Sequence, residues 1–70
     1  MITYKPLLKL LIDRDIKKGD LVEKAKISWS TMAKINKNEY ISLEVIDRLC
    51  DILDVQPGDL IEHLSKNENV

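Results

Sequence analysis

The fold is decided by the stretch KGDLVEKAKISWSTMAKIN, residues 18–36. Apolar residues stand at helical spacing on both sides of a break in the pattern: Leu21, Val22 and Ala25 before it, Met32 and Ile35 after it. The break falls at residues 25–27, Ala-Lys-Ile. This arrangement predicts two short amphipathic helices joined by a turn of about three residues.

Ser28 stands where the second of these helices would begin. Its hydroxyl can accept a hydrogen bond from the amide of Ser30 or Thr31, as an N-cap side chain does, so the helix should start at Trp29. Two helices joined by so short a turn cross at roughly 90–120°, which leaves the second one free to project a polar face into a groove. Its outward positions are Trp29, Ser30, Ala33 and Lys34. In a small chain, this layout indicates binding to nucleic acid.

Three further helices are predicted around this pair. Pro6 suits the first turn of a helix that ends at residues 13–15, and Ser42 can cap a helix that runs to about Asp54. Pro57 should start a last helix through Leu60, Ile61 and Leu64. Residues 1–4 could be extended and pair with a second copy. The tail, residues 66–70, is expected to be disordered.

Composition favours one small helical domain spanning residues 1–70. A chain of 70 residues buries only about 60% of its unfolded surface, enough for a single core. Its hydrophobic content of 44% with two Gly and two Pro suits a helical bundle. No apolar run approaches the roughly 18 residues of a membrane span, and residues 1–4 lack the order of a signal peptide, so a cytoplasmic protein without membrane contact is expected.

The chain carries no pattern typical of catalysis or metal binding. Its single Cys, Cys50, shares a helical face with apolar residues and is expected to be a small buried side chain. Its single His, His63, has no second His or Cys at ligand spacing and is expected at the surface. No triad or phosphate-cradling Gly loop is present. We therefore predict no enzyme activity, no metal, no cofactor and no small-molecule ligand.

The net charge of −1 conceals a segregation of charge along the chain. Residues 17–40 contain six Lys against three acidic residues, whereas residues 41–70 have a net charge of −5. One interpretation is a basic face for phosphates with an acidic back turned away from them. The other is an ordinary solvated surface. The position of the two short helices within the basic half favours the first interpretation.

Residues 21–35 and 42–60 resemble the Cro/C1-type helix-turn-helix family of repressors, in particular its short bacterial and mobile-element regulators. The ending LCDILDVQPGDL, residues 49–60, is the more specific part of the resemblance. The resemblance covers nearly the whole chain. It implies an all-α, lambda-repressor-like bundle of five helices, in which the helix over residues 28–36 enters the DNA major groove.

The resemblance also implies roles for individual residues. Base edges would be contacted by Trp29, Ser30 and Lys34, and phosphates by Lys18, Thr31, Lys37 and Asn38, with Ser28 at the start of the same helix. Three positions depart from the family pattern. Lys26 replaces a frequent turn Gly, residues 17–20 lack the usual cap and Gln, and Leu11 and Asn36 replace an Arg–Glu pair. Apolar packing by Leu11 could substitute for that pair.

The preferred functional hypothesis is a sequence-specific regulator of double-stranded DNA, most simply a repressor that occupies a promoter. Such proteins commonly bind paired half-sites about 34 Å apart as homodimers. The candidate dimer surface is the last predicted helix with the turn before it, including Ile61 and Leu64. The alternative is a protein-interaction or antitoxin-like module with weak DNA binding. Trp29 likewise has two interpretations: it contacts DNA, or it folds back over the preceding helix or fills a protein interface.

Overall fold

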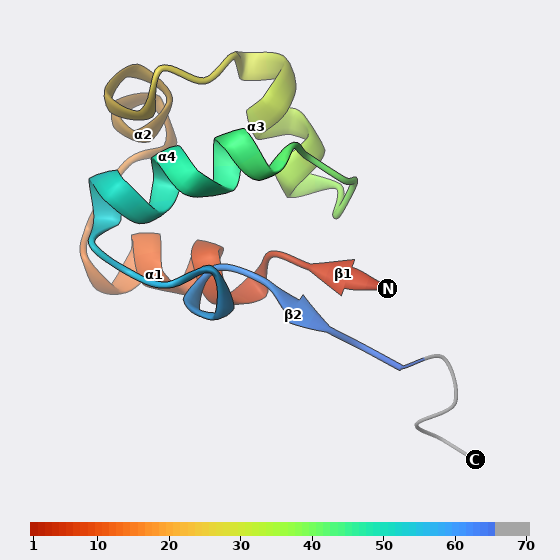
Figure 1. The fold of residues 1–70 in the computed structure, drawn as a ribbon. Coiled ribbons are helices and arrows are strands. Elements are labelled where there is room, and N and C mark those ends of the chain that lie inside the picture. Colours follow the sequence, from red (N-terminus) through yellow and green to blue (C-terminus); the bar gives the residue numbers. More distant parts are fainter. Residues whose placement is uncertain (66–70) are drawn as a thin grey trace.

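The structure, a computed structural model, describes residues 1–65 and contains four α-helices within them (Figure 1). They are α1 (Lys5–Asp13), α2 (Lys18–Ala25), α3 (Trp29–Asn36) and α4 (Leu43–Leu53). A 3-10 helix, η1 (Pro57–Asp59), follows them, and two short strands, β1 (Ile2–Thr3) and β2 (Glu62–His63), lie near the two ends of the described chain. The four α-helices lie where the sequence predicts them.

Local side-chain chemistry explains where α3 and α4 begin. The Ser28 hydroxyl accepts a hydrogen bond of 3.0 Å from the amide of Thr31. The Ser42 hydroxyl accepts one of 3.2 Å from the amide of Val45. Each bond satisfies an amide that has no partner within its own helix. Both predicted N-caps are therefore confirmed.

The turn between α2 and α3 uses the left-handed backbone that a Gly adopts most easily. Lys26 has φ 55° and ψ 43°, which costs a residue with a Cβ about 1–2 kcal/mol. The turn is held by hydrogen bonds on both sides: the amide of Ile27 donates to the carbonyl of Val22 at 3.1 Å. From α4, the Arg48 guanidinium donates to the Lys26 carbonyl at 3.1 Å and to the Glu44 carboxylate at 2.6 Å.

The core joins all four helices. Its buried side chains are mostly Leu and Ile, and both inward positions of α3, Met32 and Ile35, are at most 1% exposed. Leu11, which stands where the family has a charged residue, is also buried. The Arg14 side chain connects α1 to the end of α4 by donating to the Leu53 carbonyl. The helix-turn-helix is thus fixed to a core built from the whole described chain.

The prediction of a fifth helix is wrong. After the single turn of η1, the chain straightens into β2, which pairs antiparallel with β1 in the register Ile2↔His63 and Thr3↔Glu62 (Figure 1). The described residues therefore form four α-helices with a two-stranded sheet, rather than five helices. The extended start exists as predicted, although its partner strand is in the same chain. The expectation for residues 66–70 lies outside the described residues.

Competition for backbone groups explains why the last helix does not form. In an α-helix, the amide of Leu64 would donate to the carbonyl of Leu60. Here that carbonyl accepts from the amide of Leu7 at 3.2 Å, and the amide of Leu64 donates to the carbonyl of Met1 at 2.8 Å. The side chain of Leu60 is also fully buried. The N-terminal segment and α1 therefore take the partners that a fifth helix would need.

A Gly at the start of α2 provides a test of how α2 meets α3. A Cβ added at Gly19 would lie 3.8 Å from the nearest ring carbon of Trp29, which is an ordinary contact distance. Because Ala forms helix better than Gly, Gly19→Ala should raise the free energy of unfolding by about 0.5–1 kcal/mol. Urea unfolding followed by Trp fluorescence measures the change. A loss of stability would show that the Trp29 ring lies closer to α2 than described.

Candidate nucleic-acid interface

The helix α3 exposes one polar face and buries the opposite one. Trp29, Ser30, Ala33 and Lys34, the four outward positions expected from the sequence, are all exposed. Because Met32 and Ile35 anchor the other face in the core, α3 cannot rotate without losing apolar burial. The helix is therefore a rigid support for the side chains that it presents to solvent.

Trp29 is exposed yet not free of the protein. Its side chain is 63% exposed, and two atoms of its six-membered ring lie 3.8 and 3.9 Å from the position of a Cβ at Gly19. The ring therefore lies close to the start of α2, at a distance that would bring a Cβ at Gly19 into ordinary contact with it. This contact sets the direction of the ring, while most of its surface stays available to a ligand.

Lys18 connects the two helices at a second point. Its ammonium group donates a hydrogen bond of 3.0 Å to the Asn36 side-chain carbonyl at the end of α3. Asn36 stands at one of the two positions where the resemblance implies an Arg–Glu pair, so this bond connects α2 to the end of α3 at that position. An ammonium group has three N–H donors, so Lys18 keeps two for another acceptor such as a phosphate.

Two hydroxyls shape the first turn of α3. The Ser28 oxygen accepts from the Thr31 amide and lies 3.0 Å from the Thr31 hydroxyl. Thr31 is half-buried, whereas Ser28 is exposed. Both side chains are therefore already used in holding the helix start, which fixes the positions of Trp29 and Ser30 between them.

The loop after α3 is anchored by Tyr4, a residue to which the sequence analysis assigned no role. Asn38 has a left-handed backbone with φ 58°, and its side-chain carbonyl accepts from the Tyr4 amide at 3.1 Å. The Tyr4 hydroxyl donates to the Glu39 carbonyl at 2.6 Å. Tyr4 is 2% exposed, and burial raises the pKa of its phenol. No local pattern reveals this contact, because its partners lie more than 30 residues away. Lys37 itself remains exposed.

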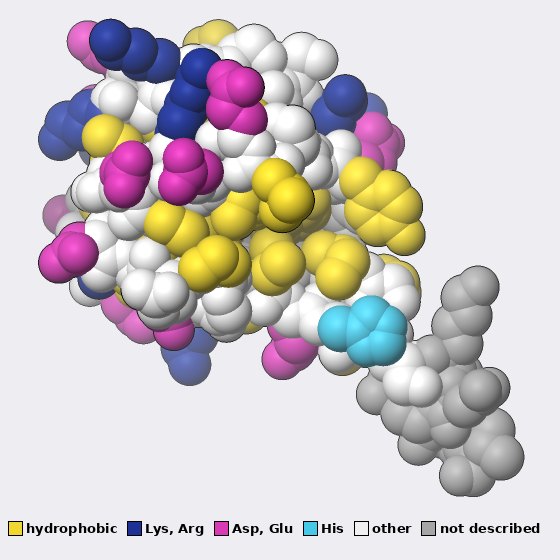
Figure 2. Space-filling view, in the orientation of Figure 1, with side chains coloured by type: hydrophobic (Ala, Val, Ile, Leu, Met, Phe, Trp, Pro, Cys, Tyr) yellow, Lys and Arg dark blue, Asp and Glu magenta, His cyan; other side chains and the backbone are white. Residues whose placement is uncertain are grey.

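The charge of the surface follows the segregation seen in the sequence. The six Lys residues of positions 17–40 are all exposed: Lys17, Lys18, Lys24, Lys26, Lys34 and Lys37. On the face that Figure 2 shows, hydrophobic side chains gather along the middle and acidic side chains lie beside them, while Lys and Arg side chains stand mostly at the top and edges. The exposed side of α3 therefore belongs to the basic half of the chain.

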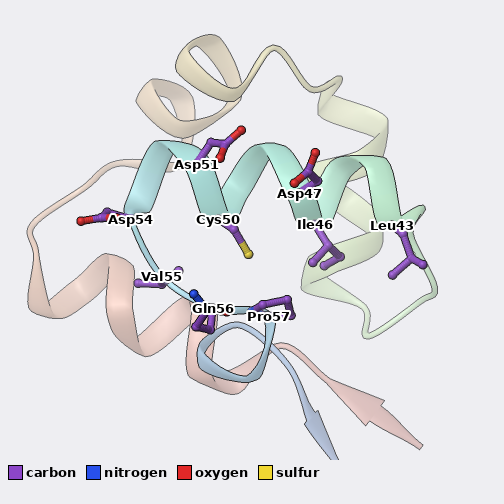
Figure 3. Close-up of a pocket in the computed structure, with 9 residues that line it drawn as sticks. All are labelled: Leu43, Ile46, Asp47, Cys50, Asp51, Asp54, Val55, Gln56 and Pro57. Carbon is purple, nitrogen blue, oxygen red and sulfur yellow. The ribbon is translucent and has the colours of Figure 1, made fainter.

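A hollow between α4 and the segment after it is lined by apolar, acidic and uncharged polar residues and not by lysines (Figure 3). Cys50 and Ile46 point into it, whereas Asp47 and Asp51 point toward solvent. Cys50 is half-buried rather than fully buried as predicted, and burial together with neighbouring carboxylates raises the pKa of its thiol. A raised pKa lowers the fraction of reactive thiolate. Over residues 1–65, no cluster of three or more His, Cys, Asp or Glu could hold a metal ion, and no helix is long and apolar enough to cross a membrane.

A sequence model of the Cro/C1-type helix-turn-helix DNA-binding domain matches residues 6–66. The chain belongs to this family. The crystal structure of the transcriptional regulator VanUg is similar in fold, with a TM-score of 0.88 and 49% sequence identity over 93% of this chain and 87% of that one. No curated protein matches the chain. The resemblance inferred from residues 21–35 and 42–60 is thereby confirmed.

The buried Tyr4 predicts a pH dependence of stability. Its raised pKa means that the unfolded chain loses the phenol proton first, so the stability present below about pH 10 should fall as the pH rises through that value. Tyr4→Phe should flatten this fall. At neutral pH it should cost about 0.5–1.5 kcal/mol, because the bond to the Glu39 carbonyl is lost.

Tyr40 supplies the matched control, since its side chain is 78% exposed. Tyr40→Phe should leave both the neutral-pH stability and its alkaline decrease as in the parent protein. Denaturant unfolding of the three proteins between pH 7 and pH 11 makes the comparison. An equal alkaline decrease in the Tyr4 and Tyr40 variants would contradict the assigned role of Tyr4.

Proposed function

We propose that the protein is a sequence-specific transcriptional regulator that binds double-stranded DNA with α3 in the major groove, and that it acts as a repressor. The observation that carries the proposal is the exposed polar face of α3 beside the lysines of residues 17–40, on a helix fixed by Met32 and Ile35. Membership of a DNA-binding family and the similarity to a transcriptional regulator support it.

The size of α3 suits the groove. An α-helix with its side chains is about 10–12 Å across, and the major groove is about 12 Å wide, so a helix such as α3 can lie within it. Trp29 would lay its exposed ring against a thymine methyl or a sugar edge, and Lys34 would reach guanine O6 or N7. Ser30 is short and tolerates several bases. Base reading would therefore depend on three side chains of one short helix.

Phosphate contacts would come from both ends of the helix-turn-helix. Lys18 has two N–H donors beyond its bond to Asn36, and Lys37 lies exposed at the end of α3. Asn38 uses its side-chain carbonyl for Tyr4, so its NH₂ group would face a phosphate. Ser28 and Thr31 would act mainly by holding the helix start. Such contacts set the register on the duplex without reading sequence.

So small a set of base readers favours two copies on paired half-sites, about 34 Å apart. Repression follows most simply from occupancy, since a bound dimer blocks a promoter that overlaps its site. A second candidate function is a protein-interaction module that binds DNA weakly. The exposure of the large apolar side chains Leu43 and Tyr40 favours this alternative.

Selection of bound duplexes from a random pool near physiological salt tests the proposal. The parent protein should recover an inverted repeat, and Trp29→Ala should recover an altered half-site. Recovery of no motif would contradict specific binding and favour the protein-interaction function. If Trp29→Ala lowered thermal stability but left the recovered motif unchanged, Trp29 would not be a base reader.

Lys37 tests the phosphate contacts separately from base reading. Lys37→Ala should weaken binding to all duplexes about equally and reduce the slope of log affinity against log salt by about one. Lys9→Ala removes the same charge from α1 and should leave the slope unchanged, because Lys9 lies outside the helix-turn-helix. Fluorescence anisotropy titrations at several salt concentrations measure both. Equal slopes for the two variants would remove Lys37 from the interface.

A further inference from the structure

The loop that follows α3, residues 37–39, offers a phosphate only side-chain donors. The backbone amides of its three residues donate to carbonyl groups of α3 at distances of 2.9–3.2 Å. They therefore cannot form the anion-binding concavity that successive free N–H groups make in other turns. The Lys37 ammonium is the charged donor of this loop, and its side chain is exposed. Where this ammonium stands depends on the path of the loop backbone.

A single residue, distant in the sequence, holds that path at two successive positions. The backbone amide of Tyr4 donates to the Asn38 side-chain carbonyl at 3.1 Å, and the Tyr4 hydroxyl donates to the Glu39 carbonyl at 2.6 Å. Asn38 has a positive φ of 58°, a conformation that few residues with a Cβ adopt, so the loop needs support from its surroundings. The two bonds from Tyr4 supply this support.

Tyr4 is itself firmly held. It directly follows β1, which pairs with β2, and its side chain is 2% exposed within the core. The loop, by contrast, is exposed at all three of its residues. A displacement of the loop would break the bonds to Tyr4 while Tyr4 stayed in place. The bonds therefore restrict the loop, and through it the position of Lys37.

We propose that Tyr4 is a positioning residue for DNA binding: buried and out of reach of the duplex, it holds the loop after α3 so that Lys37 meets a phosphate. The inference rests on the proposed function, which supplies the phosphate contact of Lys37. A loop that is ordered only part of the time binds with an affinity reduced by its ordered fraction. One neutral hydrogen bond changes such an equilibrium by a factor of about two to ten, which sets the expected size of the effect.

The first test compares Tyr4→Phe with Tyr40→Phe. Tyr4→Phe keeps the buried ring and the backbone bond to Asn38, and it removes only the hydroxyl that holds Glu39. Tyr40→Phe removes a hydroxyl from a ring that is 78% exposed. Both are titrated by fluorescence anisotropy on the duplex recovered by selection and on one of scrambled sequence, under conditions where circular dichroism shows them fully folded. Tyr4→Phe should bind both duplexes about two- to tenfold more weakly than the parent protein, and Tyr40→Phe should bind as the parent does.

The second test asks whether Tyr4 acts through Lys37. In a Lys37→Ala background the contact that Tyr4 supports is absent, so Tyr4→Phe should weaken binding by a smaller factor there than in the parent protein. Tyr4→Phe alone should reduce the slope of log affinity against log salt by less than the ~1 expected for Lys37→Ala, because the phosphate contact forms less often. The sequence recovered by selection should not change, since phosphate contacts do not read bases. A role in stability alone would move none of these quantities in a fully folded protein.

Equal affinities of Tyr4→Phe and Tyr40→Phe would overturn the inference, as would an equal loss from Tyr4→Phe in the presence and absence of Lys37. In either case a parent protein that recovers a motif would leave the proposed function standing. A parent protein that binds duplexes without recovering a motif, yet shows the dependence of Tyr4 on Lys37, would support the inference and refute sequence-specific regulation. A parent protein that binds no duplex would refute both.

Discussion

The left-handed backbone at Lys26 sets the angle between α2 and α3, and thereby decides which side of α3 meets solvent. This conformation is unfavourable for a residue with a Cβ, and the surroundings compensate for its cost. The amide of Ile27 closes the end of α2, and Arg48 holds the Lys26 carbonyl from α4. Because Ile27 is buried directly after the turn, the core also resists any other path of the chain. The outward face of α3 depends on all three effects.

The first and last segments of the described chain are each ordered by the other, because β1 and β2 form only as a pair. β1 alone would be too short to persist, and residues 60–64 have the apolar spacing of a helix. Together they exchange backbone hydrogen bonds, and this pairing brings Tyr4 beneath the loop after α3. The strand pair therefore supports the loop at the end of α3, far away in the sequence. It also places Ile2 beside α4, where it lines one hollow together with Leu43 and Ile46.

The sequence sufficed wherever a structure is determined by neighbouring residues. Ser28 and Ser42 indicate where their helices begin, because an N-cap bond joins residues only three positions apart. The apolar spacing of α3 is likewise local, because it reflects one face of one helix. The helix prediction failed at residues 60–64, because the hydrogen bonds that replace the helical ones involve Met1 and Leu7, which are distant in the sequence. The anchoring by Tyr4 was out of reach for the same reason. For Trp29, the sequence left open whether the ring folds back over the preceding helix, and the structure places it near Gly19 of α2. Spacing along the chain carries no information on partners that only the fold brings together.

The candidate contact residues differ in how far the free protein has already ordered them. Lys18, Ser28 and Asn38 each make an intramolecular hydrogen bond, and Trp29 lies against Gly19, so binding would cost them little conformational entropy. The same bonds use part of their capacity to donate or accept, so Ser30 and Lys34 would be the more adaptable of the proposed base readers. A preordered surface of this kind fits the backbone of any duplex well but distinguishes few bases. Under the proposed function, sequence preference would then come from repetition of the site, because a second copy of α3 would double the number of bases that are read.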